Sequence, residues 1–308
     1  MNRKREQMKK KEGYVRDIIL IVICLLLILL GVVLVAALWK QQSRYEAEKK
    51  QWEQKEQKYE KQLKKLRKQQ KEDQAAETAH PNARLLENLD DSNPGDVLEP
   101  YVLDMEDISR YFSAYEIVEG DPVYQRINGK SYCQNPDIGL DELTYFKMLH
   151  YNFDGEIQVG ELIMNSALKE DVLEIFQELF EHQYQIQSMY LVDNYWTGDG
   201  ITSDSASIDQ NNTSAFNYRQ STASAELSNH AFGRAIDINP LQNPYIWYNE
   251  DGTPDEYYRD EKYIDRSLDD PHIIDHDDLC CRLFLERGFT WGGDWVNPID
   301  YQHFEKRE

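Results

Sequence analysis

Two histidines and two aspartates in the C-terminal part of the sequence have the types and spacing of a hydrolytic metal site. His230 and Asp237 lie in the string Ser-Asn-His-Ala-Phe-Gly-Arg-Ala-Ile-Asp-Ile-Asn, and Asp300 precedes His303 in Asp-Tyr-Gln-His. Asp237 stands between apolar residues, where an ionised carboxylate has to be paired, hydrogen-bonded or bound to a metal. Gly233 allows the chain to turn, so that His230 and Asp237 can converge.

Two imidazoles and one carboxylate, with a fourth position left open, form the ligand set of a catalytic zinc. We therefore expect His230, Asp237 and His303 to hold one Zn²⁺ per chain. A metal in such a site lowers the pKa of its bound water toward about 7. Asp300 lies three residues before His303 and is placed to receive the proton of that water as a general base.

Two different metal assignments compete with this zinc site. Two histidines and one acid also suit a facial Fe(II) site, although the first histidine and the acid of the oxygenases lie two residues apart rather than seven. His272 and His276 are four residues apart, as in helical zinc motifs. Pro271 and the nearby aspartates favour a solvated loop or a helix start for that pair instead.

The motifs Ser-x-His-x-x-Gly-x-Ala-x-Asp, Trp-Gly-Gly-x-Trp and Asp-x-x-His occur here in that order. Together they resemble the D-alanyl-D-alanine carboxypeptidase family of zinc peptidases, which includes VanY-type carboxypeptidases, VanX-type dipeptidases and L-alanyl-D-glutamate endopeptidases. The resemblance covers roughly residues 155–303. It implies the small α+β metallopeptidase fold shared with the Hedgehog signalling domain, with zinc on the three ligands named above.

The resemblance also implies roles for two further side chains. Asp300 matches the general base of the family. The segment Asn-Thr-Ser-Ala-Phe-Asn-Tyr-Arg, which ends at Arg219, matches the segment that holds the substrate-binding arginine. Arg219 would then polarise the scissile carbonyl and stabilise the oxyanion, as a cation does where negative charge develops. Without the resemblance, Arg219 would be interpreted as an ordinary ion pair of an acidic domain.

The function implied by the resemblance is hydrolysis of a peptidoglycan stem peptide, most simply removal of a terminal D-alanine. Cleavage between L-alanine and D-glutamate is the alternative activity of the same site. Two alternative functions, in which the protein is not an active enzyme, also remain. One is an inactive zinc-bearing module that binds the cell wall, and the second is a scaffold that organises a membrane complex through its helix and stalk.

The elements around these motifs predict an α+β domain over residues 101–308. We expect a helix from Asn165 to about residue 182, because its apolar residues fall on one face. A second helix should begin near Asp277 and end at Gly288. Strands are expected within residues 184–192, 234–238 and 288–291. Helices and strands do not alternate regularly, which argues against a parallel βαβ sheet.

Residues Ile18–Trp39 form an uncharged run of 22 residues and predict a transmembrane signal anchor. At a rise of about 1.5 Å per residue the run spans roughly 33 Å, enough for the hydrocarbon core. The leader 1–17 is rich in Lys and Arg and should stay in the cytoplasm. A cleaved signal peptide would have a shorter apolar region and small residues at its end. The expected location is therefore a single-pass plasma-membrane protein with its catalytic domain outside.

Residues 40–73 predict a helical stalk, because they contain neither glycine nor proline and are dense in Lys, Glu and Gln. Tyr45, Trp52, Tyr59 and Leu66 recur every seven residues, but the second apolar position of each heptad is mostly charged. A weak parallel homodimer and a solvated single helix are both compatible with this pattern. Residues 74–100 are polar and acidic, contain several prolines and predict a linker.

The charge of the chain is strongly asymmetric. Residues 1–73 hold 19 Lys and Arg against 10 Asp and Glu, whereas residues 74–308 hold 15 against 46. A net charge of −22 excludes a general nucleic-acid binder, since phosphate affinity requires a basic surface. The 4 cysteines are too few for a disulfide-dense scaffold.

Overall fold

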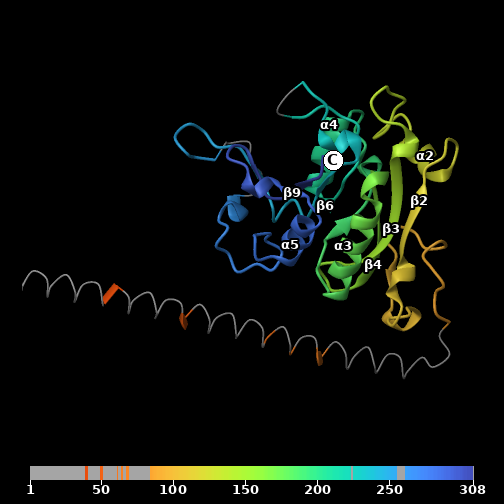
Figure 1. Cartoon of the computed structure of the whole chain (residues 1–308), viewed down its shortest axis with the longest axis horizontal. Helices are drawn as coiled ribbons and strands as arrows, with labels where there is room; N and C mark the ends of the chain where they lie inside the picture. Colours follow the sequence, from red (N-terminus) through yellow and green to blue (C-terminus); the bar gives the residue numbers. More distant parts are fainter. Residues whose placement is uncertain are drawn as a thin grey trace, which may run out of the picture. The chain divides into compact units, whose positions relative to one another are not determined.

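The structure is a computed structural model that describes residues 39–40, 49–50, 61, 64, 67–68, 84–222, 225–254 and 261–307. Contacts between residues divide the chain into two units, Met1–Ala75 and Ala76–Glu308, and the second unit contains the folded domain (Figure 1).

The predicted leader, nearly all of the predicted anchor and most of the predicted stalk lie outside the described residues. The few residues of the first unit that are described are helical. In the part of the chain that the structure describes, no helix combines the length and the apolar composition needed to cross a bilayer.

A four-stranded antiparallel sheet forms the body of the domain, in the order β1-β4-β3-β2. Its strands are β1 (Val97–Leu98), β2 (Phe112–Glu116), β3 (Leu143–Tyr151) and β4 (Ile157–Asn165). Strands β3 and β4 pair along their whole length, and nearly every residue on both of their faces is buried. Because both faces are covered, the two strands are largely apolar instead of alternating regularly with polar residues.

Four α-helices are described in this domain: α2 (Pro122–Ile127), α3 (Lys169–Glu181), α4 (Gly200–Asp209) and α5 (Leu279–Glu286). The predicted helix from Asn165 is confirmed, but its first turn is a 3₁₀ turn, capped by the Asn165 side chain, that leads into α3. The predicted second helix is confirmed as α5, and Asp278 rather than Asp277 caps it. Helix α4 was not predicted, since its apolar residues follow no clear face.

Short strands complete the fold and carry most of the side chains of the site described below. Strands β7 (Ala235–Asp237), β11 (His303–Glu305) and β9 (Thr290–Trp291) form a three-stranded antiparallel sheet in that order. Strand β8 (Tyr245–Ile246) pairs with β10 (Ile299–Asp300), and β5 (Ser188–Met189) runs parallel to β6 (Asn212–Thr213). The strands predicted within residues 234–238 and 288–291 are confirmed as β7 and β9, and the one predicted within residues 184–192 is confirmed in part, as β5.

The strand expected within residues 184–192 is confined to the two residues of β5. Gln183 has a φ of 53°, and Ile186 donates its backbone N–H to Tyr151 in the main sheet. The chain then enters a 3₁₀ turn, Val192–Tyr195. These short contacts replace the longer strand that the imperfect alternation of apolar residues predicted.

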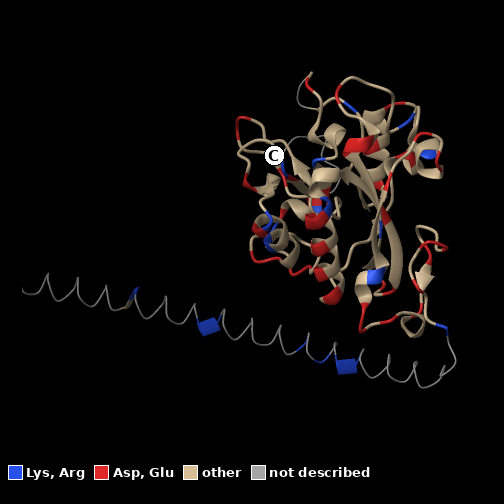
Figure 2. Ribbon diagram, turned by 45° about the vertical axis from the view of Figure 1, so that its right-hand side comes forward, with Lys and Arg blue, Asp and Glu red and all other residues tan. Residues whose placement is uncertain are grey.

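Two hydrophobic clusters flank the main sheet and make the domain an α+β fold. The larger cluster joins the sheet to α3, α5 and the sheet of β7, β11 and β9. The smaller cluster includes Ile127 of α2 and Phe216. Figure 1 shows α3 between strands β3 and β4 on the right and helix α5 on the left. Asp and Glu residues are spread over the domain and outnumber Lys and Arg, as Figure 2 shows.

Candidate active site

The first candidate ligand, His230, lies in a 3₁₀ turn, Asn229–Phe232, that Ser228 caps by accepting the His230 backbone N–H. Gly233 ends the turn with a φ of 63°. A Cβ at Gly233 would lie 2.7 Å from the backbone nitrogen of Asn165, so a larger residue does not fit. This glycine reverses the chain into β7, as the sequence predicted.

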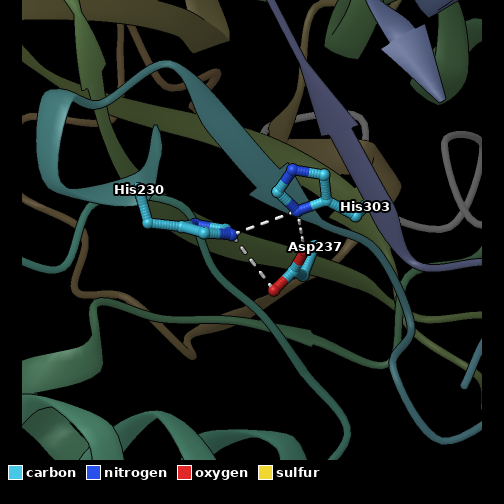
Figure 3. A group of neighbouring side chains, drawn as sticks. All are labelled: His230, Asp237 and His303. Carbon is cyan, nitrogen blue, oxygen red and sulfur yellow. Dashed lines mark hydrogen bonds and ion pairs between the residues drawn. The ribbon is translucent and has the colours of Figure 1, made fainter. Parts of the chain in front are cut away.

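Strand pairing brings the other two candidate ligands together. Asp237 on β7 lies directly opposite His303 on β11 in the antiparallel register, although the two residues are far apart in the sequence. His303 Nδ1 is 3.0 Å from Asp237 Oδ1, and His230 Nε2 is 3.4 Å from Asp237 Oδ2. The two imidazole nitrogens face each other at 3.3 Å, and Figure 3 shows all three side chains pointing to one place. We call His230, Asp237 and His303 the His–Asp–His group.

The spacing of these donor atoms matches the requirement of a zinc ion. Bonds of about 2.0–2.1 Å in a tetrahedron place neighbouring ligand atoms roughly 3.3–3.4 Å apart. The three side chains are buried, at 3%, 4% and 6% exposure, and their ligand atoms lie within 4.8 Å of one another. The donors, two nitrogens and one carboxylate oxygen, are those that zinc prefers. The group therefore fits a metal ion.

Hydrogen bonds on the far side of each ring leave the facing nitrogens available as ligands. His230 Nδ1 lies 2.6 Å from the Ala215 carbonyl oxygen and so donates its proton there, which leaves Nε2 unprotonated. His303 Nε2 lies 3.1 Å from Glu305 Oε2, which leaves Nδ1 for the metal. Asn229 Nδ2 donates to the same Glu305 oxygen. Backbone carbonyls and carboxylates in this position fix the orientation and tautomer of ligating histidines.

Glu305 was not identified from the sequence. It lies two residues after His303 on β11, and side chains two apart on a strand share a face. The string His-Phe-Glu at the end of the chain, with alternate residues polar, was the signal that could have found it.

The electrostatic environment of the group favours positive charge at its centre. Burial by itself would raise the pKa of Asp237, but the adjacent His230 and His303 hold that pKa well below its usual range. Burial would lower the pKa of His303, yet its hydrogen bonds to Asp237 and Glu305 raise the pKa to about 10. A site that stabilises a cation on the buried His303 ring is also suited to a divalent metal.

Asp300 lies beside this group on β10, opposite Tyr245 of β8. A Cβ at Gly292 would lie 2.9 Å from Asp300 Cβ and 3.2 Å from His303 Cβ, so both side chains flank the same glycine. Asp300 Oδ1 is buried and has no hydrogen-bond partner among the described residues. Burial, reinforced by the charge of Asp237, raises the pKa of Asp300 to about 8. A buried carboxyl oxygen without a partner, beside the metal ligands, is placed to accept and return a proton.

Arg219, the residue implied by the resemblance, is buried and ion-paired. Its Nη2 donates to Asp204 Oδ2 at 2.7 Å, and its Nη1 donates to the Gln220 carbonyl oxygen at 3.1 Å. The ordinary ion pair expected without the resemblance is thus present. The charges of Arg219 and Asp204 both act on the Asp300 carboxyl, so the pair also lies near the site. Asp204 on α4 was missed, since nothing in its local sequence distinguishes it.

The competing histidine pair does not converge. His272 bonds to Asp270 and Gln185 and stacks on Phe153, whereas His276 pairs with Asp294 at the surface. Within the described ranges, His230, Asp237 and His303 make up the one group of histidines, cysteines and acids that could hold a metal ion.

Three other features of the sequence could have had a functional role: its cysteines, the N-x-S/T glycosylation sequons and the tryptophans of the Trp-Gly-Gly-x-Trp motif. Cys133 is exposed and Cys280 and Cys281 are buried, all three as free thiols. Asn211 and Asn212, which begin sequons, are buried and hydrogen-bonded and offer no glycosylation site. In the Trp-Gly-Gly-x-Trp motif, Trp291 is buried in the core, while the Trp295 ring lies 5.2 Å from the His303 ring.

An α+β domain that gathers two imidazoles and a carboxylate, with a second carboxyl group beside them, is the architecture of a metallohydrolase. The family model described as D-alanyl-D-alanine carboxypeptidase matches residues 221–306. That segment belongs to the family, and the chain is a zinc metallopeptidase. The match includes His230, Asp237, Asp300 and His303, while Arg219 precedes it. No curated protein and no solved structure matches the chain.

Proposed function

We propose that this protein is a membrane-anchored zinc peptidase that hydrolyses an amide bond of peptidoglycan stem peptides, with removal of a terminal D-alanine as its first activity. The observation that carries the proposal is the convergence of three donor atoms at zinc spacing next to Asp300. The family match supports the peptidoglycan-like substrate, since that family is described by its D-alanyl-D-alanine carboxypeptidase activity.

Each side chain of the site has a distinct role in this proposal. His230 through Nε2, Asp237 through its carboxylate and His303 through Nδ1 would hold one Zn²⁺ per chain. A bound zinc ion acts as a Lewis acid and lowers the pKa of water. Asp300 takes the proton of the attacking water at Oδ1, its unpartnered buried oxygen, and gives it to the leaving amine as the C–N bond of the amide breaks. Arg219 stabilises the negative charge that develops on the substrate carbonyl oxygen.

Cleavage between L-alanine and D-glutamate is the second candidate activity for the same residues. An inactive wall-binding module is less well supported, because it has no need for a buried, unpartnered carboxyl group beside the metal ligands. A scaffold is likewise less well supported, because it has no need for three converging ligands.

In this proposal, the segments that precede the catalytic domain hold it at the outer face of the plasma membrane. Residues 18–39 anchor the chain in the plasma membrane, with the leader in the cytoplasm and the domain outside, where cell-wall peptides are found. Residues 40–73 form a helical stalk that spaces the domain from the membrane and pairs weakly with a second copy. The α+β domain is assigned to the metallopeptidase fold shared with the Hedgehog signalling domain on its motif order.

Mass spectrometry of muropeptides incubated with the zinc-loaded full chain tests this function. Carboxypeptidase activity gives stem peptides one D-alanine shorter, whereas endopeptidase activity separates L-alanine from D-glutamate. The Asp300→Asn variant serves as the matched control, because it keeps the shape of the side chain but removes the base. Unchanged muropeptides with fully zinc-loaded enzyme would refute the proposed hydrolysis and favour the wall-binding module.

A further inference from the structure

The guanidinium of Arg219 has two of its three nitrogens engaged by the protein. Nη2 donates to Asp204 Oδ2 and Nη1 donates to the Gln220 carbonyl oxygen. The third nitrogen, Nε, is buried and has no hydrogen-bond partner in the described part of the chain. A buried donor without a partner is costly, and a ligand bound in the site can supply the missing acceptor.

Helix α4 is shaped to receive the segment that carries Arg219. A Cβ at Gly200 would lie 2.9 Å from Arg219 Cβ and 3.2 Å from Asn217 Oδ1, so this segment packs directly on the first residue of the helix. Asn217 Nδ2 donates to the Gly200 carbonyl oxygen at 2.8 Å. Asp204 lies one turn further along α4, on the same face, and reaches the guanidinium.

The buried face of α4 is polar rather than apolar, which is unusual for a helix in a domain core. Its buried residues are Ser203, Asp204 and Ser207. Ser207 accepts a hydrogen bond from Asn212 Nδ2, in the strand that precedes the Arg219 segment. The helix therefore contributes little hydrophobic stabilisation, and its polar contacts place the chain between residues 212 and 219.

The Asp204–Arg219 pair is well protected from water, with side chains 10% and 8% exposed. A planar guanidinium held at two nitrogens has a defined orientation, so the direction of the third N–H is also defined. The Arg219 segment is bonded directly to the turn that carries His230, because Asn217 donates its backbone N–H to the His230 carbonyl oxygen at 3.2 Å and Ser228 donates its backbone N–H to the Arg219 carbonyl oxygen at 3.1 Å. The unpartnered Arg219 Nε–H and the unpartnered Asp300 Oδ1 thus belong to the same locality, one as donor and one as acceptor.

We propose that Asp204 is a positioning residue that holds Arg219 so that its Nε–H donates to the carbonyl oxygen of the scissile amide. This inference rests on the role proposed for Arg219. Asp204 touches no reacting atom and acts only through the guanidinium. Without Asp204, the backbone of Arg219 would keep its position but the guanidinium could rotate away from the substrate. A small misplacement of such a group is enough to slow a reaction considerably.

The test compares Asp204→Asn, Arg219→Ala and the double variant in the zinc-loaded full chain, with a stem pentapeptide ending in D-Ala-D-Ala and with muropeptides. Arg219→Ala should lower kcat by about 10²–10³-fold. Asp204→Asn should lower kcat by roughly 10–10²-fold with a smaller change in KM. The double variant should be no slower than Arg219→Ala. Zinc content should be unchanged in all three.

A matched control and a second readout separate positioning from a general structural effect. Glu178 on α3 forms a 2.7 Å ion pair with Arg287, away from the site, and Glu178→Gln should leave kcat unchanged. In the metal-free protein, the effects of Asp204→Asn and Arg219→Ala on the urea midpoint should not add up in the double variant, as expected for two side chains in contact.

The outcomes that overturn the inference differ from those that overturn the proposed function. Wild-type kcat in Asp204→Asn, or a double variant slowed by the product of the two single effects, would show that Asp204 does not act through Arg219. Additive urea midpoints in the metal-free protein would count against the contact itself. Wild-type kcat in Arg219→Ala would instead remove Arg219 from the proposed mechanism.

Discussion

Glu305 should control how tightly the site holds zinc, although it is not a ligand. Its Oε2 accepts the Nε2–H of His303 at 3.1 Å, and Asn229 and Arg307 hold the carboxylate in place. Burial opposes ionisation, but the hydrogen bonds and charges around Glu305 lower its pKa to about 2, so it is ionised at neutral pH. An ionised acceptor makes the opposite ring nitrogen, Nδ1, a better ligand.

The size of the effect follows from what each substitution removes. Glu305→Gln keeps an oxygen that can accept the His303 proton but removes the charge, which supplies about half the strength of such a bond. Glu305→Ala removes the acceptor altogether. Loss of a partner of this kind costs about 10–100-fold in metal affinity, and each tenfold step is about 1.4 kcal/mol. We expect roughly tenfold weaker zinc binding in Glu305→Gln and about 100-fold in Glu305→Ala.

Competition with a chromophoric chelator at pH 7 measures these affinities in the full chain. Asp278→Asn is the matched control, because it also removes a largely buried carboxylate but lies on the cap of α5. Its zinc affinity should equal that of the wild type. Wild-type zinc affinity in a folded Glu305→Ala variant would refute the reasoning, and Glu305 would then be a structural residue of β11.

Three further predictions concern the base, a ligand and the pH dependence of stability. Asp300→Asn should lower turnover by about 10²–10⁴-fold with zinc content unchanged; peptide assay and metal analysis check this, and loss of zinc would contradict it. His303→Ala should bind less zinc and lose the thermal stabilisation that zinc gives, about 2.7 kcal/mol at a zinc concentration 100 times Kd; equal melting shifts with zinc in both proteins would count against His303 as a ligand. Burial raises the pKa of Asp278 to about 7, so the folded state binds this proton more tightly than the unfolded state. Stability should therefore fall as pH rises from about 4 to about 7, by up to about 1.4 kcal/mol per pH unit. In Asp278→Asn, the urea midpoint should no longer fall as the pH rises over this range. The same fall in the variant as in the wild type would show that other groups cause it.

Helix and strand positions near the site were largely predictable because their signals are local. Asn165 and the apolar face after it mark α3, and Asp278 with Gly288 delimits α5. The main sheet was not predictable in the same way. Its strands β3 and β4 are buried on both faces, so they lack the alternation by which a half-exposed strand is recognised.

The sequence by itself identified two side chains with unusual neighbours. Asp237 is a carboxylate between the pairs Ala-Ile and Ile-Asn, and His230 is followed by the glycine turn at Gly233. These are properties of a few consecutive residues. Only the tertiary structure decided that Asp237 lies opposite His303, that the Ala215 carbonyl orients His230, and that Asp204 holds Arg219. Each of these contacts joins residues separated by a turn, a helix or a large part of the domain. Their existence depends on strand register and helix packing, which arise from burial summed over the whole core and from no single local pattern.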